Sequence, residues 1–346
     1  KERRQVVGAH ENGTFADSFR GSALLHCGSS LPQYGNTPLQ TVYLSHRACL
    51  DHDTGEDHPE CRRRLMAIED RLVETGLHDL LVHHDAPQAT RDQLLRVHTP
   101  AHIDLVERTA HVGKTTRLDP DTVVGPESAT AARHAAGAVI AAVDLVVGDR
   151  FDTAFCAVRP PGHHAERNRA MGFCLFNNIA VGAAHALEEY SLKRVAIVDF
   201  DVHHGNGTED IFQDDERVLF CSTFQHPFYP FTPLLPDAPN RVSVPLEPTA
   251  ASAEFRAAVT ERWLPALEAF APEAVFVSAG FDAHVADEMS HVRLTDADYR
   301  WITQVIATVA ARSASNRIVS ALEGGYEFHS LARCVEQHLR VLMGLH

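Results

Sequence analysis

The sequence is short of basic residues. Its 31 Lys and Arg residues stand against 46 Asp and Glu, which gives a formal net charge of −15. Because binding to the phosphates of a nucleic acid needs a basic surface, this balance argues against a nucleic-acid-binding protein. The one dense basic cluster is the triplet Arg62, Arg63 and Arg64, which we expect on the solvated face of a helix.

Signals for disulfides and for membrane insertion are also missing. The chain has seven cysteines, an odd number with no CxxC pair, which indicates a reducing compartment rather than a disulfide framework. No apolar run reaches transmembrane length, and the N-terminal residues contain no contiguous signal-peptide core. With 45% hydrophobic residues, we expect a soluble, cytoplasmic, globular protein. The sequence does not indicate its oligomeric state.

The chain divides into two parts by composition. Residues 1–40 are rich in Gly, Ser, Asn and Pro without periodicity, which predicts an irregular N-terminal extension. Residues 41–346 alternate between strand and helix patterns without a repeat or linker, which predicts one domain with a mainly parallel sheet and helices on both faces, an α/β fold. The predicted strands are 41–46, 152–158, 194–200, 273–279 and 317–322, and the predicted helices are 59–76, 127–148, 180–190 and 331–344.

Charged residues gather where the predicted strands end, in the stretch "VAIVDFDVHHGNGTEDIF" above all. Asp201 and His203 leave one strand as alternate residues, so their side chains point the same way and can bind one metal. Asp282, at the end of another apolar strand, is the best-placed third ligand. Three ligands leave positions open for water and substrate, which is typical of a catalytic zinc site. The ligand types do not distinguish zinc from iron(II).

Further polar residues can supply the chemistry around this metal. His163 and His164 follow "RPPG", and either can serve as a general base for a water at the metal. Asp199 and Asn206 lie close to the ligands in sequence, and each can hydrogen-bond one of these histidines. Tyr326, in "EGGY", carries a phenol that can donate a hydrogen bond to a developing oxyanion. Together these residues predict an amide hydrolase.

Five motifs resemble the histone deacetylase superfamily, in particular its class II and bacterial deacetylase-like amidohydrolase branch: "RPPGHH", "MGFCLFNNIAVGA", "VAIVDFDVHHGNGT", "SAGFDAH" and "EGGY". The resemblance runs from about Thr41 to the C-terminus and leaves the N-terminal extension out. It implies an arginase-like, three-layer α/β fold. It also implies zinc-dependent removal of an acyl group from an amine.

The resemblance assigns roles to individual residues. It makes Asp201, His203 and Asp282 the zinc ligands. It makes His163 and His164 the tandem histidines, with Asp199 and Asn206 as their partners. We favour His164 as the base, with His163 supporting it electrostatically. Tyr326 matches the tyrosine that stabilises the transition state. The channel residues that bind substrate would be Gly172, Phe173, Tyr229, Gly325, Glu288 and Met289. Two structural potassium sites would take Asp199, Asp201, His203, Ser222 and Thr223, and Phe212, Asp215 and Val218.

The sequence departs from the family pattern around the channel. "FTP" at 231–233 replaces the usual "GTG", and Phe224 stands where many bacterial relatives have histidine, so the resemblance does not fix channel shape or substrate choice. Polyamine-preferring relatives place a glutamate at the channel rim; here alignment puts Met289 at that position, next to Glu288. If Glu288 faces the mouth, we expect it to attract a second ammonium group; otherwise it is a solvated surface residue.

These residues leave three hypotheses for function. The first is an enzyme that hydrolyses an acetyl-lysine side chain or an acetylpolyamine. The second, of a different class, is a metal-containing protein that binds acyl-lysine with little turnover. The third is an arginase-like hydrolase with two manganese ions, but one DxH pair and one distant Asp predict a single catalytic metal.

Overall fold

The computed structural model describes residues 39–236 and 238–345. Residues 1–38, where we predicted an irregular extension, lie outside this part of the chain. The predicted boundary near residue 41 therefore stays a prediction.

An eight-stranded parallel sheet forms the centre of the fold, in the order β2-β1-β5-β10-β9-β6-β7-β8. Its strands are β1 (Thr41–Ser45), β2 (Val82–Asp85), β5 (Thr153–Cys156), β6 (Val195–Asp199), β7 (Val218–Gln225), β8 (Arg241–Leu246), β9 (Ala274–Ala279) and β10 (Ile318–Leu322). Every residue of β5, β6, β7, β9 and β10 is buried, because helices cover both faces of the sheet. A separate hairpin pairs β3 (Thr116–Arg117) with β4 (Val123–Val124) in antiparallel fashion.

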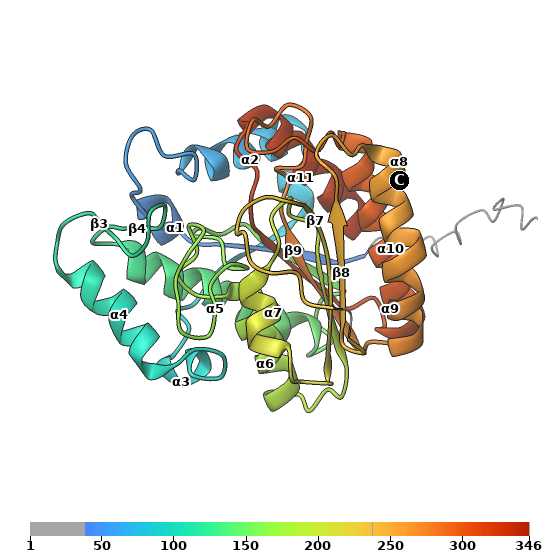
Figure 1. Cartoon of the computed structure of the whole chain (residues 1–346), viewed down its shortest axis with the longest axis horizontal. Coiled ribbons are helices and arrows are strands. Elements are labelled where there is room, and N and C mark those ends of the chain that lie inside the picture. The colour runs from blue at the N-terminus through green and yellow to red at the C-terminus, as the bar shows by residue number, and fades with distance from the viewer. Residues whose placement is uncertain (1–38, 237, 346) are drawn as a thin grey trace, which may run out of the picture. The chain divides into compact units, whose positions relative to one another are not determined.

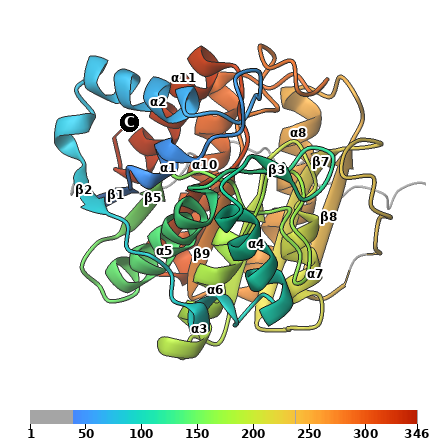
Figure 2. The ribbon, with the colours of Figure 1, turned by 90° about the vertical axis from the view of Figure 1, so that its left-hand side faces the viewer.

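Two groups of helices enclose the sheet (Figure 1, Figure 2). One group packs around α5 (Ser128–Val146) and α6 (Asn178–Glu189), and the other around α2 (Arg63–Glu74), α10 (Asp296–Ser313) and α11 (Phe328–Leu342). The remaining helices are α1 (Ala48–Asp51), η1 (His78–Leu80), α3 (Arg91–Leu94), α4 (Pro100–His111), α7 (Asn206–Phe212), α8 (Ser252–Ala258), η2 (Val259–Trp263) and α9 (Leu264–Phe270). The three layers confirm the predicted α/β architecture.

All five predicted strands and all four predicted helices are present, with ends shifted by a few residues. The prediction missed β2, β7 and β8, and it missed α4 and α10 among the longer helices. β2 has no apolar pattern to find, because its four residues "VHHD" are all exposed at the edge of the sheet.

The expectation about membrane-length segments needs one correction. α5 is long and apolar enough to cross a membrane by length and composition alone. Its alanines favour the helix, and 83% of its apolar window is buried inside the protein, packed on α6, β1, β5 and β10. α5 therefore serves as a core helix of this fold.

Candidate active site

The candidate site lies at the carboxyl ends of β5, β10, β9 and β6, which are neighbours in the sheet. The loop after β5 carries His163 and His164, the end of β6 carries Asp199, Asp201 and His203, the loop after β9 carries Asp282, and the loop after β10 carries Tyr326. Ligands of open α/β sheets bind at this edge. The topology therefore brings together residues that are up to 163 positions apart in the sequence, from His163 to Tyr326.

Asp201, His203 and Asp282 form a buried cluster whose ligand atoms all lie within 4.8 Å of one another. Nδ1 of His203 is 3.0 Å from Oδ1 of Asp201 and 3.2 Å from Oδ2 of Asp282. Backbone N–H groups orient the carboxylates: Val202 donates to Oδ1 of Asp282 (2.9 Å) and Gly324 to Oδ2 of Asp201 (2.8 Å). Oδ2 of Asp282 is buried without a hydrogen bond. Two carboxylate oxygens and an imidazole nitrogen are a donor set that fits zinc.

The pKa values of the cluster residues also indicate that the cluster attracts a cation. Burial alone would lower the pKa of His203, but its hydrogen bond to Asp201, its close contact with Asp282 and the negative charges of both carboxylates raise it to about 10. Burial and repulsion from Asp201 raise the pKa of Asp282 to about 6. Two buried carboxylates thus attract positive charge strongly, and a divalent cation meets that demand better than one proton does.

The tandem histidines have different partners, as the sequence suggested. His163 donates from Nδ1 to Oδ2 of Asp199 (2.9 Å), and His164 donates from Nδ1 to Oδ1 of Asn206 (2.8 Å). The amide orientation follows from Nδ2 of Asn206, which donates to Oε1 of Glu166 (2.8 Å). With Nδ1 carrying the proton, Nε2 of His164 is left as the acceptor of that ring.

The two partners push the histidine pKa values apart. Burial would lower the pKa of His163, but the charges of Asp199 and Asp201 raise it well above 6.5. Burial and the nearby charge of His163 lower the pKa of His164 well below 6.5, and the neutral Asn206 does little to oppose them. Neighbouring groups with opposite protonation preferences are typical of an acid and base pair.

Tyr326, which lines the channel, is positioned by Asp287 and Arg64. Its backbone N–H donates to Oδ2 of Asp287 (2.6 Å), and the Arg64 guanidinium lies 4.9 Å from the centre of its ring. Burial raises the pKa of the Tyr326 phenol well above 10 against the opposing charge of Arg64. The phenol therefore stays protonated near neutral pH and can donate a hydrogen bond.

The prediction that the arginine triplet is solvated is wrong for Arg64. Arg62 and Arg63 are exposed, but Arg64 is completely buried. Its Nε donates to the carbonyl oxygen of Gly325 (2.6 Å), and its Nη2 donates to the carbonyl oxygen of Glu323. The carboxylate of Glu60 accepts from Arg64 (3.2 Å) and from Arg159 (2.8 Å to Nη2). One buried ionic network thus supports the loop that carries Tyr326.

Glu323 is a second residue that the sequence reasoning did not single out. It is completely buried, and its Oε2 accepts from the backbone N–H groups of Gly162 (2.7 Å) and His163 (3.1 Å). Burial raises its pKa to about 7. Because Glu323 belongs to the "EGGY" loop, it joins the tyrosine loop to the histidine loop. The "EGGY" motif could have indicated this role, since a glutamate directly after a fully buried strand needs hydrogen-bond partners.

A channel of about 170 Å³ leads to the cluster. Its lining residues are Asp121, Pro161, His163, His164, Gly172, Phe173, His203, Phe228, Tyr229, Met289, Gly324 and Tyr326. Gly172, Phe173, Tyr229 and Met289 thus lie where the resemblance places channel residues. Glu288 is exposed, and neither Glu288 nor Gly325 lines the channel. Asp121, in the turn that joins β3 to β4, was missed because nothing in its local sequence connects it to the site.

The predicted potassium ligands fall into two groups. Asp199 and Ser222 are paired neighbours on β6 and β7, and Thr223 follows with its buried Oγ1 unpaired. Phe212, Asp215 and Val218 lie in and beside the turn between α7 and β7. There the backbone N–H of Asp215 donates to the carbonyl oxygen of Phe212, and the backbone N–H of Val218 donates to the carbonyl oxygen of Asp215 (3.0 Å each). Both potassium sites stay predictions.

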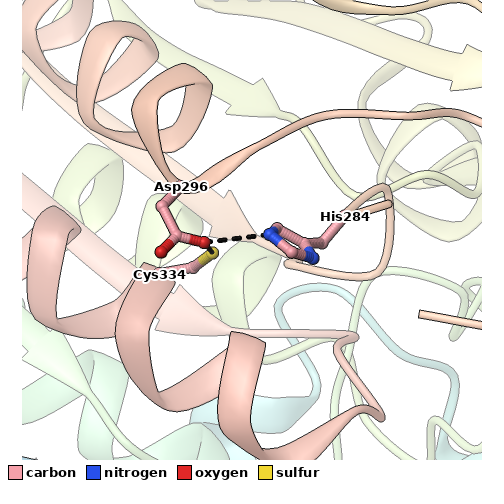
Figure 3. Close-up of side chains that lie close together, drawn as sticks. All are labelled: His284, Asp296 and Cys334. Carbon is pink, nitrogen blue, oxygen red and sulfur yellow. Dashed lines mark hydrogen bonds and ion pairs between the residues drawn. The ribbon is translucent and has the colours of Figure 1, made fainter. Parts of the chain in front are cut away.

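A second cluster of metal-ligand residue types brings His284, in the loop that follows Asp282, close to Asp296 of α10 and Cys334 of α11 (Figure 3). The backbone N–H of Ala286 donates to Nδ1 of His284 (3.1 Å), so Nε2 carries the proton and donates to Oδ1 of Asp296 (2.9 Å). Arg333 neutralises Asp296 (2.8 Å), and burial raises the pKa of the Cys334 thiol. These atoms satisfy one another, so the cluster fastens the loop to α10 and α11.

Comparison with known proteins supports the same conclusion. The family model of the histone deacetylase domain matches residues 58–342. The chain belongs to the histone deacetylase family. A solved structure, the HD domain of HDA15, superposes with a TM-score of 0.84 at 34% identity, and the match covers 89% of this chain and 90% of that one.

Curated relatives extend the comparison. An uncharacterized protein of Synechocystis is 38% identical over 85% of this chain and 96% of its own length. A histone deacetylase-like amidohydrolase of Pseudomonas aeruginosa is 36% identical over 78% of this chain and 72% of its own. The mouse polyamine deacetylase HDAC10 is 35% identical over 84% of this chain but only 46% of its own. The chain therefore spans less than half the length of that relative.

Proposed function

We propose that this protein is a zinc-dependent amidohydrolase that removes an acetyl group, or another acyl group, from a lysine side chain or a related primary amine. The observation that carries the proposal is a convergence at one channel. A buried Asp–His–Asp cluster, two histidines with opposite pKa shifts and a protonated tyrosine all meet there. Binding an acyl-lysine without turnover would need the channel but none of the acid and base groups.

The side chains divide the reaction among them. Zinc bound at Asp201, His203 and Asp282 would supply Lewis-acid chemistry, which activates water and polarises the acyl carbonyl. Neutral His164, with Nε2 as its free acceptor, takes a proton from the attacking water and later donates it to the leaving amine. Positively charged His163 and the Tyr326 phenol stabilise the oxyanion that develops on the acyl oxygen.

The test combines metal analysis with turnover on the full-length protein. We expect one zinc per chain, and release of acetate from an acetyl-lysine peptide that stops on chelation and returns with zinc. Tyr326→Phe should lower turnover by on the order of a hundredfold with metal content unchanged, the usual loss for one oxyanion donor. Substrate binding without acetate release in metal-loaded protein would support the binding-only hypothesis, and two metals per chain would support a dinuclear hydrolase.

Acetylpolyamines are a second candidate substrate. Relatives from mouse and human that are named polyamine deacetylases match at 35% and 36% identity. Asp121 places one carboxylate at the channel, where a second ammonium group could pair with it. Against this candidate, Met289 and not a glutamate lines the channel, and Glu288 is an exposed neighbour. Comparing kcat/KM for acetylputrescine, acetylspermidine and acetyl-lysine peptides decides between them.

A further inference from the structure

The loop between β7 and β8 exposes three large apolar side chains, and one of them, Phe231, packs against the channel residue Tyr229. Phe231 is 76% exposed, more than any other exposed large apolar residue in the described part of the chain. Leu234 and Leu235 follow at 41% and 39% exposed. We call these three residues the apolar rim. Grouped apolar side chains on a surface are characteristic of interaction sites.

The backbone holds Phe231 in an unusual conformation. Its N–H donates to the carbonyl oxygen of Phe228 (2.9 Å), which closes a tight turn, and its φ is +59°. A residue with a Cβ rarely adopts this left-handed conformation, and a glycine would adopt it without strain. The chain therefore keeps a bulky, exposed ring at a position where glycine would fit the backbone without strain. Such local strain is frequent where a side chain contacts a ligand.

Within the apolar rim, Phe231 continues the wall of the channel. Phe228 and Tyr229 line the channel, and the ring of Tyr229 packs edge-on against His164 with centroids 5.2 Å apart. Phe231 packs edge-on against the outer side of Tyr229, with centroids 6.4 Å apart. In an extended peptide, side chains two residues apart share a face at a spacing of roughly 6.6 Å. A lysine side chain in the channel would thus place a neighbour two positions away near Phe231.

We propose that the apolar rim binds an apolar side chain of a peptide or protein substrate, two residues from the acylated lysine, and so selects such substrates. The inference rests on the proposed function and gives it a substrate class. An acetylpolyamine gains little from the rim, because its ammonium groups lose hydration beside apolar side chains. A peptide with Leu at that position buries apolar area on both partners.

The experiment uses two acetyl-lysine pentapeptides that differ only at the positions two residues before and after the lysine, with Leu in one and Ser in the other. For the full-length wild-type protein we expect kcat/KM to be roughly tenfold higher on the Leu peptide, the gain from partly burying one aliphatic side chain. Phe231→Asn should reduce this ratio to about twofold or less, because Asn removes the ring but tolerates the left-handed backbone. Val73→Asn, at a 62% exposed residue on α2, is the matched control and should keep the full ratio.

The outcomes separate the inference from the proposed function. If wild type turns over neither peptide but releases acetate from acetylputrescine or acetylspermidine, the proposed function stands and the inference is overturned; if it turns over none of these substrates, the proposed function fails. If wild type turns over both equally, or if Phe231→Asn keeps the preference for Leu, the function stands and the inference is overturned. Sedimentation at assay concentration provides the remaining check: a wild-type dimer that Phe231→Asn dissociates would make the rim an interface between two copies, which also overturns the inference.

Discussion

Replacing Glu60 by glutamine tests the buried ionic network behind Tyr326. Glu60, Arg64 and Arg159 are all completely buried, and the carboxylate of Glu60 is shared by the two guanidinium groups. Burial would raise the pKa of Glu60, but the charges and hydrogen bonds of Arg159, with smaller contributions from His52 and Arg64, lower it to about 2. The glutamine keeps the shape of the side chain and removes its charge. It leaves two buried arginines with only neutral acceptors.

The size of the effect follows from the pKa. A carboxyl pKa that falls from 4.5 to about 2 on folding corresponds, at about 1.36 kcal/mol per pH unit, to ~3 kcal/mol of stability. Because the folded-state pKa is the lower one, this stability is fully present above pH 4.5 and is lost as the pH falls toward 2. We therefore expect Glu60→Gln to lower the free energy of unfolding by ~3 kcal/mol at pH 7 and by only ~2 kcal/mol at pH 3.5.

Urea unfolding, followed by the fluorescence of the buried Trp263, measures this difference. Glu74→Gln is the control on α2: Glu74 pairs with Arg71 at 2.9 Å but is 69% exposed, so its loss should cost less than ~1 kcal/mol. If Glu60→Gln unfolds within 1 kcal/mol of wild type at pH 7, the network does not hold its charges as the geometry requires. The same holds if the difference grows toward low pH.

Two further predictions concern the site and the core. Gly172→Ala should lower kcat at least about tenfold, because its φ is +56° and an added Cβ would meet Cδ2 of His164 at 2.3 Å. The control is Gly113→Ala, which has equal backbone strain at φ +70° but open space around the added Cβ. It should keep full activity in the same assay. Burial lowers the pKa of His338 to about 3, so its neutral form stabilises the fold fully above pH 6.5 and less as the pH falls toward 3. Wild type should therefore lose up to ~1.4 kcal/mol more per pH unit than His338→Gln below pH 6 in urea unfolding, and parallel profiles would contradict this.

The clustering of Asp201, His203 and Asp282 could be predicted from the sequence because its signals are local. Asp201 and His203 alternate directly after β6, and Asp282 follows β9 in the same way, so strand pattern and polar residue occur within a few positions. The fold then needed only the rule that parallel strands end at one edge. The same reasoning found His163, His164 and Tyr326. It could not decide which residue of the loop after Asp282 faces the channel, because Met289 lines the channel and its neighbour Glu288 does not.

The buried ionic network of Glu60, Arg64 and Arg159 was not predicted, because it depends on contacts between residues that are far apart in the sequence. Glu60 and Arg64 are four residues apart before and at the start of a helix, a spacing that is also typical of exposed ion pairs. Only the docking of α2 on α11 turns Arg64 inward, where it meets the carbonyl groups of a loop about 260 residues later in the chain. With those carbonyl oxygens and Glu60 as its partners, Arg64 is buried and supports the loop that carries Tyr326, although its sequence context suggests a solvated side chain. Buried arginines near a site are therefore recognised by the acceptors that the tertiary fold offers them, and the sequence around Arg64 contains none of these except Glu60.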